Sequence, residues 1–146
     1  MKTNRLDLAR QELMATECSL VICDTEGVCH SFHRRGVADL YELVTTRPEL
    51  LRGAAVADKV IGKGAAALMC IGGVRSVWSG VMSRGAADLF ADAGIEASCS
   101  TLTGHIINRA GTGICPVEQL CAEATSPEEC LPLISKFLES VKQKQN

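Results

Sequence analysis

Two lysines spaced four residues apart, Lys59 and Lys63, are the residues of this chain that most clearly suggest chemistry. They lie in the segment ADKVIGKGAAA, residues 57–67, whose pattern predicts the first turns of a helix. On one helix face two like charges cost about 0.2–0.5 kcal/mol, and a helix N-terminus disfavours cations. Gly62 and Gly64 each cost about 1 kcal/mol relative to alanine within a helix. A ligand anion on the helix start would resolve these conflicts, because Gly62 lets it approach the backbone.

The same segment also fits a purely structural explanation. Both lysines could be solvated surface residues, with the two glycines allowing close packing against a sheet. Asp58 is predicted to be the N-cap of the helix, and its functional alternative is a pair with Lys59 or a hydrogen bond to a ligand hydroxyl. The segment therefore predicts ligand contacts from Asp58, Lys59 and Gly62 and leaves the structural alternative open.

A second candidate region is the segment NRAGTGICPVE. Cys115 directly precedes a proline, so we expect it to be the N-cap of the following helix, with Glu118 near the third position. A helix N-terminus favours the thiolate form of cysteine, which makes Cys115 the candidate reactive thiol. Capping or simple burial is the alternative. Arg109 is predicted to contact a carboxylate or phosphate, with Asn108 and the glycine loop at Gly111 beside it.

Composition narrows the classes of protein to consider. At 146 residues and 47% hydrophobic content, the chain is expected to be one folded domain, residues 1–146. A net charge of −2 with only five aromatic residues argues against a nucleic-acid or anionic-membrane partner. The N-terminus has no secretory signal pattern and no apolar run reaches membrane-spanning length. We therefore expect a cytoplasmic protein whose eight cysteines, none in a CxxC pair, are mostly reduced.

The order of predicted elements indicates an α/β fold with a mixed sheet. Helical periodicity and proline or glycine stops predict helices, and alternating or apolar runs between turn residues predict strands. The predicted helices cover residues 4–16, 37–47, 58–71, 84–93, 116–124 and a last segment from 126. The predicted strands cover residues 18–24 and 28–33, paired as a hairpin, and residues 74–82 and 95–102.

The motifs resemble a known family. The segments GVADLYELV, LRGAAVADKVIGKGAAA and INRAGTGICPVE are similar to domain-of-unknown-function family 1893, uncharacterised prokaryotic proteins with a cytidine-deaminase-like fold. The resemblance covers nearly the whole chain, and ADKVIGK is its most specific part. It implies a cytidine-deaminase-like three-layer sandwich in which helices flank a mixed β-sheet. It implies no activity, because the family has no established one.

The resemblance also allows a prediction about zinc. Deaminases place a His/Cys-x-Glu motif at the start of the helix after the hairpin, and a Pro-Cys-x-x-Cys motif at the next strand-to-helix turn. With helix starts predicted at residues 58 and 84, the matching positions are residues 58–60 and 83–86, which contain neither His nor Cys. The three histidines form no His-x-Glu motif. We therefore expect no metal site and no cofactor.

Three functions are compatible with these patterns. The preferred one is a binding protein for a small anionic or nucleotide-like molecule, contacted by Lys59, Lys63, Asn108 and Arg109. The second is a metal-independent enzyme in which Lys63 or Cys115 is the nucleophile or base and Asp58 or Glu118 moves protons. The third is a structural or regulatory homo-oligomer, most simply a homodimer. The sequence does not separate them.

Overall fold

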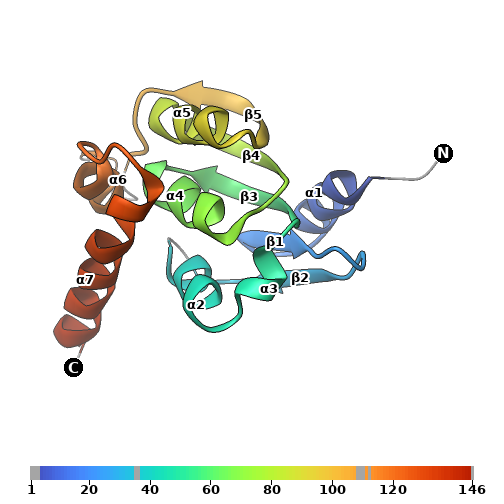
Figure 1. Ribbon diagram of the computed structural model, residues 1–146, viewed down its shortest axis with the longest axis horizontal. Coiled ribbons are helices and arrows are strands. Elements are labelled where there is room, and N and C mark those ends of the chain that lie inside the picture. The colour runs from blue at the N-terminus through green and yellow to red at the C-terminus, as the bar shows by residue number, and fades with distance from the viewer. Residues whose placement is uncertain (1–3, 35–36, 108–110, 112, 146) are drawn as a thin grey trace.

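Seven helices and five strands make up the part of the chain that the structure, a computed structural model, describes: residues 4–34, 37–107, 111 and 113–145. The strands are β1 (Leu20–Cys23), β2 (Cys29–Phe32), β3 (Ala55–Ile61), β4 (Ser76–Ser83) and β5 (Glu96–Thr103). The helices are α1 (Arg5–Ala15), α2 (Ala38–Thr46), α3 (Pro48–Leu51), α4 (Lys63–Gly72), α5 (Arg84–Ala93), α6 (Pro116–Cys121) and α7 (Pro127–Gln145). Figure 1 shows their arrangement.

The strands form a single mixed sheet in the order β2-β1-β3-β4-β5. β1 pairs antiparallel with β2 and with β3, whereas β3, β4 and β5 run parallel. The predicted hairpin is confirmed, since the Asp24 carboxylate accepts hydrogen bonds from the amides of Glu26 and Val28 and Gly27 takes a positive φ of 86°. The turn residues thus fix the register in which Cys23 faces Cys29.

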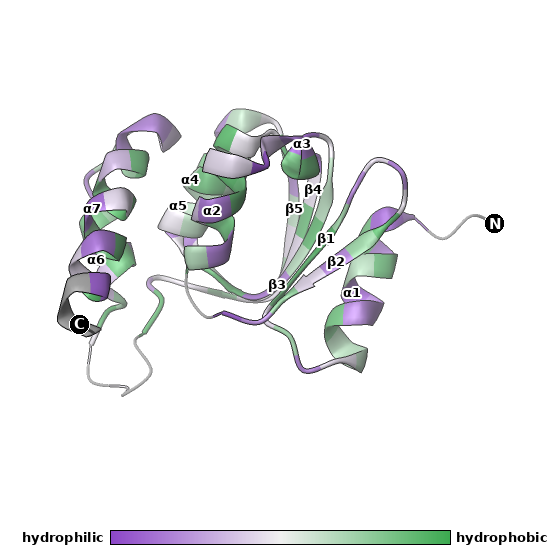
Figure 2. Cartoon of the chain, turned by 90° about the horizontal axis from the view of Figure 1, so that it is seen from below, coloured by the Kyte–Doolittle hydropathy of each residue, from purple (hydrophilic) through white to green (hydrophobic). Residues whose placement is uncertain are grey.

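Helices cover both faces of the sheet, which confirms the predicted mixed α/β fold with helices flanking the sheet. Figure 2 shows α1 on one face, α2, α4 and α5 on the other, and α6 and α7 outside the second helical layer. The core under α1 is small and includes Ala55, Ala57 and Trp78, whose ring is stacked by the Arg10 guanidinium 4.4 Å away. The larger core lies on the opposite face and includes Val56 and Ile61. In the first half of β3, Ala55 and Ala57 therefore face α1 and Val56 between them faces the opposite layer.

The predicted helix over residues 58–71 is wrong in its first turn. Asp58, Lys59 and the two residues that follow belong to β3, and α4 begins only at Lys63 after the extended N-cap Gly62. The strand forms because its backbone pairs on both edges, with β1 on one side and β4 on the other. Such tertiary pairing overrides the weak helix preference of an alanine-rich segment.

The other helix boundaries follow their local signals closely. α5 has the predicted bounds, and α4 and α5 each end at a glycine in the left-handed conformation, Gly73 at φ 76° and Gly94 at φ 72°. The short helix α3 was not expected; a proline occupies its first turn. Within the described residues, no helix has both the length and the apolar character needed to span a bilayer.

Candidate functional site

A buried carboxylate from α6 occupies the N-terminal end of α4, where the sequence suggested a ligand anion. Glu118 is only 5% exposed, and its Oε1 accepts hydrogen bonds from the Lys63 amide at 2.8 Å and from the Ser83 hydroxyl at 3.0 Å. Its Oε2 accepts from the Ile106 amide at 2.6 Å. The expected requirement for an anion at this helix start is therefore met within the chain.

The Glu118 carboxylate also links two helix starts. Ser83, which donates to it, is the N-cap of α5, and its hydroxyl accepts the Ala86 amide at 3.2 Å. The N-cap residue of α4, Gly62, also lies against this carboxylate. A Cβ built on Gly62 would be 3.3 Å from Glu118 Oε2. The starts of α4 and α5 are thereby tied to α6 through one side chain. A serine just before a helix is a capping signal, so Ser83 could have been found from sequence.

Lys63 uses its side chain to bind the end of α6. Its Nζ donates to the carbonyl oxygens of Ala122 at 3.0 Å and Ala124 at 2.7 Å, and its methylene groups pass over Gly85. The structure therefore places the candidate nucleophile in a helix-capping contact. Lys59 lies exposed in β3, so the two lysines do not share one helix face as expected.

Cys115 occupies the predicted N-cap position of α6, but its thiol makes no capping hydrogen bond. The side chain is half-buried, and its backbone amide donates to the Ile106 carbonyl at 2.8 Å. A reactive thiol at Cys115 stays a prediction. Of the neighbouring candidates, Gly111 is exposed with a φ of 71°, while Asn108 and Arg109 lie outside the described residues.

Asp58 is the titratable group whose environment differs most from the prediction. It is not an N-cap; it lies in β3 on the face of Val56, 8% exposed, and its Oδ1 accepts the Val60 amide at 3.3 Å. Among the described residues no ion pair involves this carboxyl, nor does Lys59 reach it. Burial raises the pKa of Asp58 to about 7.

A fully buried serine lies beside Asp58 on the neighbouring parallel strand. Ser79 is its register partner in β4, so the two side chains share the face that α4 covers. The Ser79 hydroxyl donates to the Val81 carbonyl, two residues nearer the carboxyl end of β4. At this point the strands come close, since a Cβ on Gly80 would lie 2.9 Å from the Lys59 carbonyl oxygen. Sequence reasoning missed Ser79 because β3 itself was missed.

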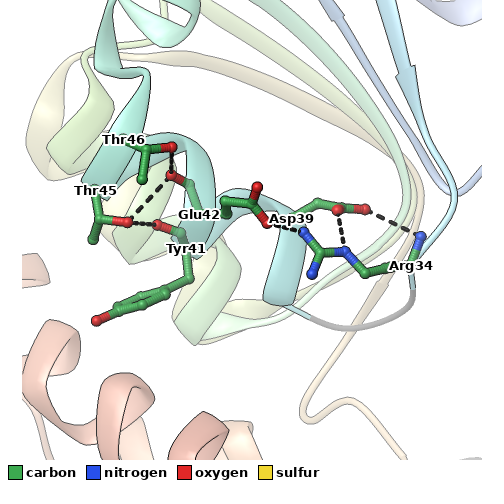
Figure 3. Close-up of polar contacts among 6 residues, drawn as sticks. All are labelled: Arg34, Asp39, Tyr41, Glu42, Thr45 and Thr46. Atoms are coloured by element: carbon green, nitrogen blue, oxygen red, sulfur yellow. Dashed lines mark hydrogen bonds and ion pairs between the residues drawn. The ribbon is translucent and has the colours of Figure 1, made fainter.

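The start of α2 carries a second buried acid, and this one is paired. Arg34 donates through its Nε to Asp39 at 2.6 Å and through its amide at 3.1 Å, and its guanidinium also pairs with Glu42 (Figure 3). Tyr41 points the other way and donates to the Ser135 hydroxyl of α7 at 2.9 Å. These contacts fix α2 between the hairpin and α7. They give Asp39 a cationic partner, whereas Asp58 has none among the residues that the structure describes.

Two surface hollows are lined by other residues. One of about 250 Å³ is lined by Cys70, Leu89, Asp92, Ala93 and residues 125–128, and one of about 500 Å³ lies along α1. Of the residues predicted for ligand binding, those that the structure describes line neither hollow. Within the described ranges, no three His, Cys, Asp or Glu side chains come together in a group able to hold a metal ion.

Comparisons with known proteins identify a family and a related structure. A family model described as a domain of unknown function, DUF1893, matches residues 8–138. The solved structure of a DUF1893 family protein from Thermotoga maritima superimposes with a TM-score of 0.83 at 23% identity, covering 94% of this chain and 92% of that one. No curated protein matches the chain. At this identity the solved structure is informative about fold alone.

Proposed function

The chain belongs to the DUF1893 family, and we propose that it binds a small anionic, nucleotide-like molecule at the carboxyl ends of β3 and β4. The observation that carries this proposal is Asp58, a buried carboxyl for which no charged partner is found among the described residues. Burying a carboxylate without a cation is costly, so such a group is retained where it serves a ligand or a proton.

The position of Asp58 in the sheet supports the same proposal. Ligands of open α/β sheets bind beyond the carboxyl ends of the parallel strands, next to the point where strand order reverses. β3 is the parallel strand that adjoins the antiparallel β1, and Asp58 is the middle residue of β3, beside Ser79 of β4. A ligand bound here would meet the Asp58 carboxyl and the exposed ammonium of Lys59, the next residue toward the carboxyl end of β3.

The chemistry of these groups favours a nucleotide-like ligand. Because its pKa is raised to about 7, the Asp58 carboxyl can donate or accept a hydrogen bond near neutral pH, as the edge of a heterocyclic base requires. Lys59 supplies a cation for a phosphate or carboxylate group. The N-terminus of α4 is not part of this site, because Glu118 already occupies it.

The proposal includes a cytidine-deaminase-like fold whose zinc motifs are replaced. A leading hairpin, the order β2-β1-β3-β4-β5 and parallel β3, β4 and β5 support it. The helix after the hairpin is α2, and the next strand-to-helix turn joins β3 to α4. The residues to compare with the zinc motifs are therefore 37–39 and 62–66, which contain neither His nor Cys. Such a protein would act in the cytoplasm.

Ligand-dependent thermal melting tests the proposal. A nucleoside monophosphate that binds should stabilise the chain by about 2.7 kcal/mol at a concentration one hundred times its dissociation constant. Asp58→Asn should abolish the shift, and Lys59→Ala should weaken it for nucleotides while leaving nucleosides unaffected. Lys136→Ala, which removes an exposed lysine of α7, is the matched control. No shift with nucleotides, nucleosides or phosphosugars, or equal shifts in all variants, would refute the site.

A homo-oligomer is the second candidate, and one observation favours it. Within the described part of the chain β5 pairs with β4 alone, so its outer edge offers backbone groups without a strand partner over Glu96–Thr103, a strand with one charged residue. Such an edge is suited to antiparallel pairing with a second copy. Light scattering measures the oligomeric state directly, and a strict monomer at high protein concentration would rule out the homo-oligomer. The enzyme alternative has less support because the Lys63 ammonium is engaged by two carbonyl groups.

A further inference from the structure

The two edges of the sheet differ in how well they are protected from pairing with another strand. β2 forms one edge; it is only four residues long, and His33 and Arg34 follow it directly. β5 forms the other edge; it is eight residues long, it contains neither lysine nor proline, and Glu96 is its only charged residue. Short strands, charges and prolines are the usual means by which edges avoid association. Among the residues that the structure describes, β5 is therefore the edge more open to a further strand.

β5 is also incompletely covered on its two faces. Six of its eight residues are exposed, although it pairs with β4 in a constant register from Glu96 to Thr103. Leu102 is the largest apolar residue among them, and it is 48% exposed. Its register partner Met82 belongs to the larger core, so Leu102 faces the layer that contains α5. Parallel strands are normally buried on both faces, and this exposure therefore indicates a further partner for β5.

α5 extends the same surface with small side chains. It packs on β4 and β5, and α5 and β5 lie together at the upper end of the molecule in Figure 1. Gly85 faces α4, because a Cβ there would lie 3.2 Å from the Lys63 side chain. At about 100° per residue, Ala87 and Ala91 are turned by about 200° and 240° from Gly85, so they face away from α4. We call β5 together with Ala87 and Ala91 the β5–α5 edge.

Charges at the two ends of the β5–α5 edge have opposite signs. At the start of β5, Asp92 and Glu96 are exposed acids, and Arg75, just before β4, offsets part of their charge. At the end of β5 lie two exposed basic residues, Arg84 directly after β4 and His105 two residues beyond β5. Two copies with antiparallel β5 strands would bring the acidic end of each against the basic end of the other, whereas parallel strands would bring like ends together.

The geometry of antiparallel strands favours a closed dimer. A two-fold axis perpendicular to the sheet relates such strands, so both copies of α5 lie on the same face of the joined sheet. Neighbouring strands are about 4.8 Å apart, so a helix above β4 and β5 would lie about 10 Å from its symmetry mate, which is a distance at which helices pack. Ala87 and Ala91 are small enough to allow that approach.

We propose that the β5–α5 edge binds a second copy of this chain, with the two β5 strands antiparallel and the two sheets joined into one. The proposal rests on the homo-oligomer named above as the second candidate function, and it specifies the direction of the strands, the pairing of the charged ends and the contact between the α5 helices. Asp58 lies on β3, with β4 between it and β5. Ligand binding and dimerisation therefore involve different strands and can be tested separately.

Hydrogen exchange of the full-length chain, followed by mass spectrometry at protein concentrations below and above the dimer dissociation constant, tests the surface. Peptides that cover Glu96–Thr103 should exchange more slowly in the dimer, because outward amides of β5 become hydrogen-bonded. Peptides that cover Cys29–Phe32, at the other sheet edge, should exchange equally at both concentrations. Sedimentation velocity that shows only monomer overturns both this proposal and the homo-oligomer. A dimer with unchanged exchange over β5 overturns this proposal alone.

Substitutions test the α5 contact and the charged ends. Ala91→Arg and Glu96→Lys should each raise the dimer dissociation constant by about tenfold or more, the first through steric overlap and the second through like charges. Ala15→Arg, at an exposed alanine of α1, is the matched control and should leave it unchanged. Arg84→Glu combined with Glu96→Lys reverses both ends and should restore the dimer. If a variant does not fold, hydrogen exchange of the unaltered chain still decides. An unchanged constant for Ala91→Arg, an equal loss with Ala15→Arg, or no restoration by the double variant would overturn the proposal.

Discussion

Replacing Asp58 by asparagine should change how the stability of the protein depends on pH. Asparagine has nearly the shape of a protonated aspartate, and its carbonyl oxygen can still accept the Val60 amide that Asp58 binds. The substitution therefore keeps the packing of β3 against β1 and β4 and removes only the proton equilibrium. Any difference between the two proteins across the pH range then reports on the buried carboxyl.

The magnitude follows from the position of this carboxyl. Burial raises its pKa from 3.8 to about 7, so between these values the folded protein keeps a proton that the unfolded chain has released. The free energy of unfolding then falls by about 1.4 kcal/mol for each pH unit, because folding requires uptake of that proton. Over the whole window the loss is about 4 kcal/mol, complete above pH 7 and absent below pH 4. Asp58→Asn should lack this decline.

Urea denaturation at closely spaced pH values between 4 and 8 measures the effect. Asp88→Asn, which removes an exposed carboxylate of α5, is the matched control and should follow the unaltered protein. The pKa of Asp24 is lowered, chiefly by its hydrogen bond with His30, and this group adds the opposite slope at acid pH in every variant. The difference between curves is therefore decisive. Parallel pH profiles for Asp58→Asn and the unaltered protein would refute the argument.

Three further changes test the contacts around α4. Glu118→Gln removes the charge of a buried acceptor of three hydrogen bonds and should lower the free energy of unfolding by about 2–3 kcal/mol; an unchanged urea midpoint would contradict the internal-anion assignment. Gly64→Ala brings a methyl group against the Val117 side chain of α6 and should lower the free energy of unfolding by about 1–3 kcal/mol. Gly104→Ala is the control, because a methyl group there meets open space, and it should melt at the temperature of the unaltered chain. Equal melting temperatures for Gly64→Ala and Gly104→Ala would count against close packing between α4 and α6. Lys63→Met should lower the free energy of unfolding by about 1–2 kcal/mol, because two hydrogen bonds to carbonyl groups are lost. If Lys136→Met on the exposed face of α7 lowers it equally, the Lys63 hydrogen bonds do not stabilise the fold.

Local signals were sufficient for much of the fold. The hairpin follows from the turn at Gly27, α5 from the serine before it and Gly94 after it, and α6 from the proline at its start. Each of these features is set by residues within a few positions of one another, which is the range over which sequence patterns act. They also place Cys115 at the start of α6, as predicted.

β3 could not be predicted in the same way, because its pairing partners are distant in sequence. The segment AVADKVI satisfies helical spacing about as well as it satisfies a strand, and the choice is made by β1 and β4. One signal was present: a mostly apolar segment of strand length between the turn at Arg52-Gly53 and Gly62, interrupted by Asp58 and Lys59, is compatible with a buried parallel strand. Missing that strand moved Asp58 from the sheet to a helix cap and hid its neighbour Ser79.

The lysine and glycine pattern correctly indicated that the start of α4 binds a negatively charged group. It did not indicate that this group is a side chain of the same protein. Glu118 supplies the negative charge from 55 residues further along the chain, and Gly64 lets α6 approach closely enough to deliver it. The opposite holds for Asp58, which sequence reasoning treated as satisfied and which the structure buries without a cation among the described residues. A ligand search should therefore be directed at Asp58, because an anion at the α4 start would have to displace a carboxylate with three hydrogen bonds already made.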